Sequence, residues 1–473
     1  MNLKAKAVIK NLYYTVVANF ATLAISILLN LFVPKLLGVK EYSYWQLYVF
    51  YSSYVGFLHF GWVDGIYLKI GGSEYEDLDK KSLGSQFWYL MIMEVIISSF
   101  VIIGSIIAGS SSNKSLILIL TAVVSVVTIA KTFILYVLQS TNRIKEYAQL
   151  SRGDRYLYVF FIAAYFLIGG RNFYWLIILD ILSKLIITVW GVSRISDMIF
   201  TKSFNRIKYE ISNILENISI GIKLMLSSIA GMLIIGSIRF FVEKKWTIET
   251  FGKLSFTLSI SNMFMTFINA VGVVMFPLLR RTNQNKLPHL YIVLRSLFVP
   301  LTYSFLLFYI PCKIILGIWL PEYNESLIYM GILFPMVIYE GRMSLLLNTY
   351  LKALRKEKTI LIVNVLTLTL TLLLSLFVVF YVGNLYLTVG LIIFSLALRC
   401  VLAETFLNRF LNVKLFVSQL LETILTIVFI LSNLFFSDWE SFFVYFVAFI
   451  IYILINKRSV MRSFSDFRNL LAS

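Results

Sequence analysis

Two opposite charges lie close together inside a long apolar segment of this sequence. Glu340 and Arg342 occur within VIYEGRMSLLL, residues 337–347. Side chains two residues apart on an α-helix point about 200° away from each other, so these two cannot form an ion pair with one another. If the segment crosses a bilayer, each buried charge costs about 2.5–3.5 kcal/mol. Each is therefore expected to face a polar cavity or a partner on another helix.

Other ionisable residues also fall inside apolar segments and are further candidates for a site. The acids are Glu94, Asp180 and Glu340, with Asp64 and Glu404 nearer the ends of their segments. The bases are Lys131, Lys184, Lys223, Arg239, Arg295, Arg342 and Arg399. Such residues usually line a pathway or pair with each other, so both functions have to be weighed for each.

For several of these residues a structural explanation competes with a functional one. Asp180 and Lys184 are four residues apart with the acid first, which favours an ion pair within one helix. Lys223 lies near a helix end, where its side chain can snorkel to the interface, and Arg295 is expected at the interface. His59 is either a packed residue or a proton carrier that titrates near neutral pH.

The composition makes a bilayer the main solvent of this chain. Of its 473 residues, 59% are hydrophobic and only 14% are charged, whereas soluble domains have about 25% charged residues. Fourteen apolar windows are predicted to cross a membrane, of which the fifth is short for a span and the last is weakly bounded. They are residues 12–34, 43–63, 85–108, 116–138, 155–169, 173–194, 217–242, 253–276, 291–316, 326–350, 359–381, 384–407, 416–437 and 441–456.

The distribution of basic residues orients these windows. With the N-terminus in the cytoplasm, and with the window-end residues Arg155, Arg194, Lys253 and Lys313 counted in the adjacent loops, 27 of the 42 Lys and Arg residues fall in cytoplasmic segments, 8 in outer segments and 7 within windows. This bias follows the positive-inside rule and places both termini in the cytoplasm. It also accounts for most of the net charge of +18 without nucleic acid as a partner.

Several function classes find no support in the sequence. The predicted outer loops do not exceed about a dozen residues, too little for the catalytic domain of a membrane polymerase or glycosyltransferase. No G-x-x-x-x-G-K-[ST] phosphate loop occurs, and two cysteines with two histidines give no metal-ligand spacing. We therefore expect a transporter rather than an enzyme, with no cofactor and no bound metal.

A weak internal repeat divides the chain into two halves. Ser43 aligns with Gly252 at an offset of 209 residues, and Arg143 with Arg355 at 212. Six plus six helices in the same orientation indicate a parallel repeat whose axis lies along the membrane normal. The predicted divisions, in chain order, are a six-helix lobe at 1–194, a cytoplasmic linker at 195–216, a second six-helix lobe at 217–407, and two further helices with a basic tail at 408–473.

Four stretches resemble the polysaccharide-unit flippases (Wzx-type) of the multidrug/oligosaccharidyl-lipid/polysaccharide (MOP) exporter superfamily. They are LFVPKLLGVKEYSYWQLY, ETFGKLSFTLSI, FPLLRR and LNTYLKALRKEKTILIVN. The chain departs from the family pattern at Ser43, where Gly is common, and at Leu254, where Tyr is common. The resemblance implies an all-α fold of two lobes related by a pseudo-two-fold axis, alternating access, and helices 1, 2, 7 and 8 around the cavity.

This resemblance assigns the polar residues of those helices and the intramembrane cations to substrate binding, because cations with amides and hydroxyls suit a diphosphate and sugars. The candidates are Lys131, Arg342, Arg239, Lys223, Asn262, Asn269 and His59. Glu340, Glu94 and Asp180 are the candidates for binding a coupling H⁺ or Na⁺. At an offset of 211 Arg342 aligns with Lys131, so each lobe is expected to hold one cation at a similar depth. For the polar residues of helix eight, interhelical hydrogen bonding is the alternative.

The expected activity is the flipping of undecaprenyl-diphosphate-linked oligosaccharide units, destined for O-antigen, capsule or exopolysaccharide, across a bacterial plasma membrane. A polysaccharide polymerase and glycosyltransferases are possible partners, and the superfamily implies a monomer. Two other classes stay open: an ion-coupled multidrug or cation antiporter of the same fold, and a membrane assembly scaffold without transport activity.

Overall fold

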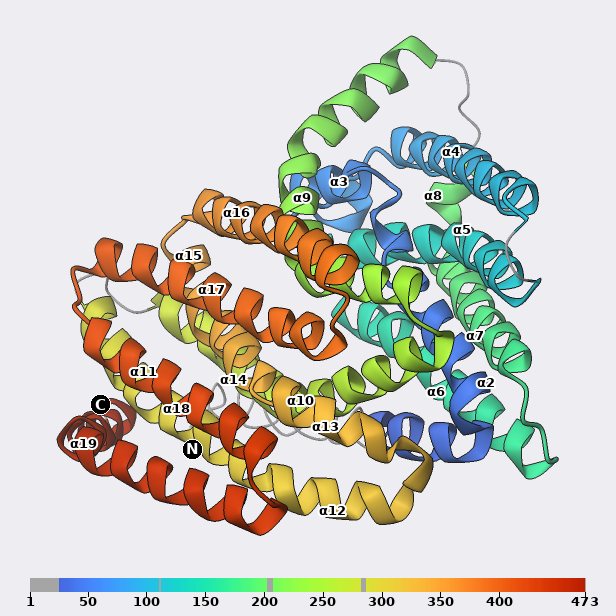
Figure 1. The fold of residues 1–473 in the computed structure, drawn as a ribbon. Helices are drawn as coiled ribbons and strands as arrows, with labels where there is room; N and C mark the ends of the chain where they lie inside the picture. The colour runs from blue at the N-terminus through green and yellow to red at the C-terminus, as the bar shows by residue number, and fades with distance from the viewer. Residues whose placement is uncertain (1–24, 110–111, 202–206, 282–285, 473) are drawn as a thin grey trace. The chain divides into compact units, whose positions relative to one another are not determined.

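The computed structural model describes residues 25–109, 112–201, 207–281 and 286–472. Side chains are described throughout these ranges except at 207–209, 266–281 and 467–472. Helices joined by short turns make up the described chain, and no strand occurs in these ranges (Figure 1). The protein is therefore all-α, as predicted.

Nine helical stretches of the described residues are long and apolar enough to cross a membrane, or ten if one bent pair counts as a single span. They comprise α4 (Lys80–Ile107), α5 (Ser112–Ser140), α7 (Phe173–Arg194), α9 (Ile207–Lys245), α11 (Leu287–Ser304) continuing through α12 (Tyr309–Trp319), α16 (Glu357–Leu376), α17 (Leu385–Leu411), α18 (Phe416–Phe435) and α19 (Asp438–Ala472). The bent pair comprises α13 (Asn324–Leu333), with the short turn before it, and α14 (Met336–Gly341) through α15 (Asn348–Ala353).

The remaining four predicted windows differ from simple spans. Window 12–34 lies mostly outside the described residues. Window 43–63 is broken, because α2 (Val33–Ser52) ends before a series of turns that leads to α3 (Trp62–Ile70). Windows 155–169 and 253–276 fall within α6 (Ile144–Leu167) and α10 (Ile248–Arg281). Together these elements are roughly consistent with the predicted fourteen helices.

Glycine explains two interruptions near window 43–63, a kink within α2 and the break before α3. Gly38, in the stretch LFVPKLLGVKEYSYWQLY, has φ 73° and kinks α2 between its two parts. Gly61 has φ 83°, and a Cβ at this position would lie 2.6 Å from the backbone nitrogen of Ile222 on α9. Only glycine adopts this left-handed conformation at no steric cost, and only glycine allows so close an approach. The chain therefore breaks at 53–61 despite its apolar sequence.

The chain forms two compact units by its internal contacts. One consists of Leu36–Met232, and the other of Met1–Lys35 with Leu233–Ser473. The division falls within α9, which is continuous from Ile207 to Lys245. The boundaries predicted from the repeat, at 194, 216 and 407, describe sequence symmetry rather than compactness and stay predictions.

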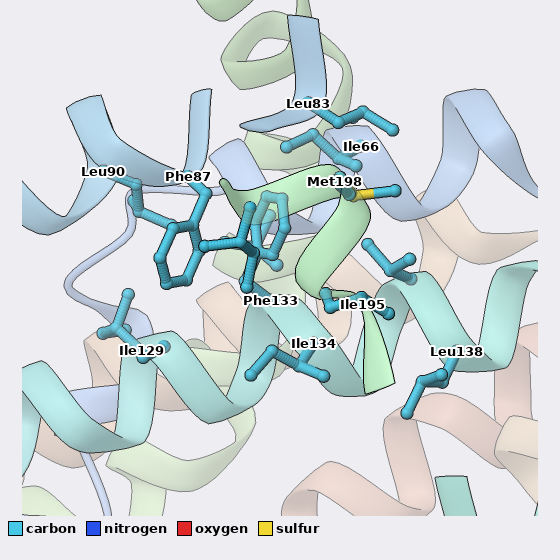
Figure 2. Packing of buried hydrophobic residues seen from close by; sticks show 14 of the residues in the cluster. Ile66, Leu83, Phe87, Leu90, Ile129, Phe133, Ile134, Leu138, Ile195 and Met198 are labelled. Atoms are coloured by element: carbon cyan, nitrogen blue, oxygen red, sulfur yellow. The ribbon is translucent and has the colours of Figure 1, made fainter. Parts of the chain in front are cut away.

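The core of the first unit lies where α3, α4, α5 and the short helix α8 (Ser196–Ile199) meet (Figure 2). Phe87 and Leu90 of α4 pack with Phe133 of α5, and Met198 of α8 joins the same cluster. The rings of Phe87 and Phe133 have centroids 5.2 Å apart in an edge-to-face arrangement, a favoured geometry for aromatic pairs. This packing fixes α4 along α5.

In the second unit, the last two helices are built into the bundle. α18 packs on α19, α19 packs along α11, and α18 also contacts α13. In Figure 1 the red helix α19 lies beside the yellow helix α11. α10 packs against α13 and α14, and α16 packs against α17. The C-terminal pair of helices thus belongs to the core of this unit.

Candidate functional site

The helix that carries Glu340 and Arg342 is bent by 49° at the break around Pro335. Proline has no backbone N–H, so it cannot donate the hydrogen bond that an α-helix needs at this position. Directly after the bend, Arg342–Leu347 form a π-helix; short π segments are frequent at functional sites. The bend at Pro335 positions the next two turns of helix.

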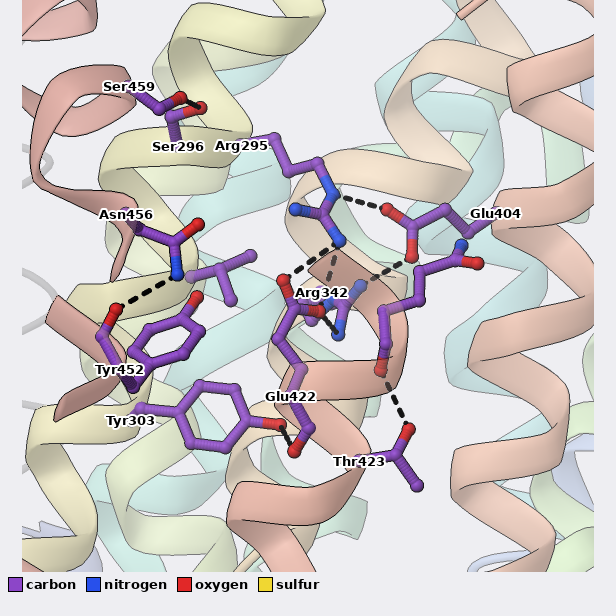
Figure 3. Close-up of polar contacts among 12 residues, drawn as sticks. Arg295, Ser296, Tyr303, Arg342, Glu404, Glu422, Thr423, Tyr452, Asn456 and Ser459 are labelled. Carbon is purple, nitrogen blue, oxygen red and sulfur yellow. Dashed lines mark hydrogen bonds and ion pairs between the residues drawn. The ribbon is translucent and has the colours of Figure 1, made fainter. Parts of the chain in front are cut away.

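Arg342 is buried among carboxylates from two other helices (Figure 3). Its Nη2 pairs with Glu404 of α17, and its Nη1 lies 2.8 Å from Oε2 of Glu422 on α18. Arg295 of α11 contacts the same two acids, with Nε 2.5 Å from Oε1 of Glu404 and Nη2 2.9 Å from Oε1 of Glu422. We call these four residues the charge quartet.

The charge quartet is electrically neutral and almost completely buried. Each of the two arginines is 4% exposed and each of the two glutamates 1%. Tyrosines complete it: Tyr291 donates a 2.9 Å hydrogen bond to Glu404 Oε1, and Tyr303 donates a 2.8 Å bond to the backbone oxygen of Glu422. Breaking one partner of such a buried arrangement leaves an uncompensated charge and costs about 3–5 kcal/mol. The quartet therefore joins α11, the bent helix, α17 and α18.

Glu340 has a separate partner, as the helical geometry required. Its Oε1 lies 3.1 Å from Nη1 of Arg399 on α17, and Nε of Arg399 donates a 2.9 Å hydrogen bond to Oδ1 of Asn364 on α16. Glu340 is half-buried, and Arg399 and Asn364 are buried. Both charges of the opening motif are thus neutralised by neighbouring helices.

The first unit contains two further ion pairs, whose residues are buried or half-buried. Lys131 of α5 lies 2.6 Å from Oδ2 of Asp154 on α6. Asp180 and Lys184 form an i,i+4 pair on α7, which confirms the prediction for them. The hydroxyl of Tyr48 donates a hydrogen bond to the same oxygen of Asp180.

His59 is buried beside Asp64, with Nε2 3.8 Å from an oxygen of the carboxyl group. Its Nδ1 accepts a 3.0 Å hydrogen bond from the backbone N–H of Gly61. A nitrogen that accepts a hydrogen bond carries no proton, so the ring proton of neutral His59 is on Nε2. Asp64 also accepts a 3.4 Å hydrogen bond from the hydroxyl of Tyr136. His59 is therefore a packed residue at the start of α3.

Glu94 differs from all the other buried acids. It lies on the buried face of α4 and is 0% exposed. Within the described residues, neither of its carboxyl oxygens has a hydrogen-bond partner of good geometry, and it forms no ion pair. The Ser125 hydroxyl of α5 is its polar neighbour.

The remaining predicted residues belong to α9 and α10. Nη2 of Arg239 donates a 2.9 Å hydrogen bond to Ser255, and its guanidinium lies 5.3 Å from the centroid of the Phe251 ring. Lys223 is exposed and has no hydrogen-bond or ion-pair partner in the described part of the chain. Asn262 is exposed, and the side chain of Asn269 lies outside the described residues.

Sequence reasoning placed Arg295 at the interface, which is wrong, and it missed Glu422 and Asp154. Glu422 is the seventh residue of window 416–437, so an inventory of every acid in every window finds it. Asp154 stands one residue before window 155–169 and escaped for that reason. The partner of Arg295 was not recognisable, because Glu404 and Glu422 lie 109 and 127 positions further along the chain.

The fold resembles two solved membrane transporters. A structure titled "Lipid II flippase MurJ, inward closed conformation" superimposes with TM-score 0.68 at 12% identity, covering 95% of this chain and 100% of that chain. An inward-facing multidrug resistance MATE family transporter of the MOP superfamily superimposes with TM-score 0.54 at 14% identity, covering 80% and 92%. No protein-family model matches the sequence, and no curated protein matches it.

These similarities define the class of protein. The chain is a multi-pass membrane protein with the fold of the MOP exporters, which confirms the predicted fold class. The structures that it resembles are transporters and flippases rather than enzymes. At sequence identities of 12% and 14%, the likeness establishes the fold of this chain but not its substrate.

Proposed function

We propose that this protein is a flippase that moves undecaprenyl-diphosphate-linked oligosaccharide units across the bacterial plasma membrane by alternating access. The observation that carries the proposal is the match to a lipid II flippase over 100% of that chain. In the proposal, the units serve the assembly of O-antigen, capsule or exopolysaccharide. Glycosyltransferases would supply them and a polymerase would consume them.

The C-terminal helices favour a lipid-linked substrate over a small drug. The flippase match leaves about 24 residues of this chain uncovered, 5% of 473. α18 and α19 span 416–472, so at least part of this pair lies within the matched region. The MATE transporter covers only 80% of the chain. Because Glu422 of α18 belongs to the charge quartet, these helices are also integral to the unit that contains them.

The contacts of the intramembrane cations narrow the choice of residues that could bind the substrate. Lys131 and Arg342 are each held by buried carboxylates, so a substrate anion would have to compete with an acid for either cation. Lys223 is exposed and has no partner among the described residues. We therefore assign Lys223 to the diphosphate, with Asn262 and Asn269 as candidates for sugar contacts and Arg239 as a second cation. A lysine ammonium binds phosphate as a point charge.

Transport by purified protein tests this proposal. Proteoliposomes are loaded with undecaprenyl-diphosphate-linked oligosaccharide, and its arrival in the opposite leaflet is measured by cleavage with an impermeant glycosidase. Wild type should expose the substrate much faster than protein-free vesicles, and Lys223→Ala should reduce the rate at least tenfold. Lys414→Ala is the matched control, because Lys414 is also exposed but lies between α17 and α18.

The second candidate, a cation or drug antiporter, is favoured by the MATE match and gives the opposite result in cells. A deletion strain should lose surface polysaccharide and accumulate lipid-linked units facing the cytoplasm. Unchanged polysaccharide together with raised sensitivity to cationic dyes would overturn the flippase proposal in favour of the antiporter.

A further inference from the structure

Glu94 is the one of the three predicted coupling acids that no cation neutralises in the described part of the chain. Asp180 is paired with Lys184, and Glu340 with Arg399. Glu94 is fully buried, and its two carboxyl oxygens have no hydrogen-bond partner of good geometry there. An isolated carboxylate in an apolar interior is very costly, and such a group takes up a proton instead. In this conformation Glu94 is therefore a neutral carboxylic acid.

The surroundings of Glu94 suit a proton and not a metal cation. Its side chain lies on the buried face of α4 with Leu90 and Ser98, and this face packs along α5. The nearby polar groups are the hydroxyls of Ser98 and Ser125, whose oxygens are hydrogen-bonded to each other at 2.9 Å. Oxygen-liganded cations need several more oxygens than these. In the described chain, no cluster of three acids, histidines or cysteines occurs there or elsewhere.

The charged groups of the elements packed against α4 are occupied or distant. α5 carries Lys114 and Lys131; Lys131 is paired with Asp154, and Lys114 lies eleven residues before Ser125, about 16 Å along the helix. On α8 the acid is Asp197, which is bound to Lys80 and to the hydroxyl of Tyr75. Protonation of Glu94 is therefore set by its own burial and by access to water.

We propose that Glu94 is the proton-binding site that couples transport to the proton gradient. This inference rests on the transport function proposed above. In each cycle the carboxylate takes a proton from hydronium on the outer side, forming one O–H bond and releasing one water molecule. It returns the proton to water on the cytoplasmic side, while one substrate moves outward. The buried, neutral carboxyl is the state between these two steps.

The proteoliposome assay tests this coupling when a pH gradient is imposed, with the acidic side facing the outer surface of the protein. We expect the gradient to accelerate wild-type flipping several-fold. Glu94→Gln, which is neutral and nearly isosteric, should lose the acceleration, so that its flipping rate is the same with and without the pH gradient. Glu76→Gln is the matched control, since Glu76 is an exposed acid just before α4, and this variant should respond like wild type.

Two results would overturn the coupling proposal. One is full acceleration by the pH gradient in Glu94→Gln. The other is acceleration of wild type by a sodium gradient and not by a pH gradient. If wild type moves no lipid-linked oligosaccharide at all, the proposed function fails instead.

Infrared spectroscopy of detergent-solubilised protein gives a readout that does not depend on transport activity. Wild type at neutral pH should show the carbonyl stretch of a protonated carboxylic acid, shifted in D₂O. Glu94→Gln should lose that band, and Glu94→Asp should retain a displaced one. A wild-type spectrum without the band at neutral pH would show that Glu94 is ionised and would refute the proton site.

Discussion

At the residue scale, ion pairing is the rule for the buried charges of this protein. Arg295, Arg342 and Arg399 each contact a carboxylate from another helix, and so does Lys131. A buried charge without a partner is far more costly than a paired one. A substrate anion can bind such a cation only by displacing its carboxylate. Pairing in this state therefore separates residues that hold the structure from residues, such as Lys223, that are open to a ligand.

Lys131 provides a direct test of this distinction. Lys131→Met removes the cation and leaves Asp154 buried and unpaired, so we expect lower thermal stability in detergent and little flipping. If the lysine is structural, Lys131→Met combined with Asp154→Leu should restore both stability and flipping, because neither charge is then left over. If the lysine binds the diphosphate, the double variant will be stable but inactive. The thermal midpoint and the proteoliposome rate decide between these outcomes.

The local part of this pattern was predictable from the sequence, and the rest was not. The Asp180–Lys184 pair was found because its residues are four apart on one helix. The separation of Glu340 from Arg342 followed from helical geometry in the same way. Which carboxylate meets Arg342 depends on how α17 and α18 pack, and helical periodicity contains no information about that. The unpaired state of Glu94 also requires knowledge of every neighbouring helix.

At the element scale, the quartet explains how α18 is fixed to its unit. Glu422 is held by Arg295 of α11 and by Arg342 of the bent helix, and its backbone oxygen accepts the hydrogen bond from Tyr303. Windows for α17 and α18 were predicted within a few residues of their observed bounds. The break in window 43–63 was not predicted, because it depends on the approach of Gly61 to Ile222, a contact between distant segments.

Removal of one acid from the quartet should unfold this unit more readily. Glu422→Gln leaves two arginines with one carboxylate, and we expect the free energy of unfolding to fall by about 3–5 kcal/mol. Arg295→Met in the same chain restores neutrality and should recover most of this loss. Unfolding followed by tryptophan fluorescence in detergent measures both changes. Equal stability of wild type and Glu422→Gln would show that the quartet does not hold α18 in place.

At the scale of the whole molecule, topology links the sequence to the direction of transport. In the topology predicted from the basic residues, the turn before α16 and the end of α19 lie in the cytoplasm, and the turn between α6 and α7 lies outside. The loops alternate between the two sides of the membrane in this way only if every predicted window crosses the membrane. Windows 43–63 and 155–169 are the critical ones, since the first is broken and the second contributes to a helix with a polar start. If either window does not cross, every later loop lies on the opposite side of the membrane from the one predicted.

Cysteine accessibility tests this alternation in intact cells. In a background with Cys312 and Cys400 replaced by serine, Arg171→Cys and Asn384→Cys should react with an impermeant maleimide, because both residues are exposed and are predicted to face outward. Lys358→Cys, also exposed, should react only after the cells are opened. Because Arg171 and Asn384 both follow windows 43–63 and 155–169, failure of one of these windows to cross would leave both cysteines unlabelled in intact cells. Labelling of Asn384→Cys without Arg171→Cys would instead show an odd number of errors between the two positions. Labelling of all three positions as predicted would support the orientation that the proposed proton step assumes, in which Glu94 takes up its proton from the outer side.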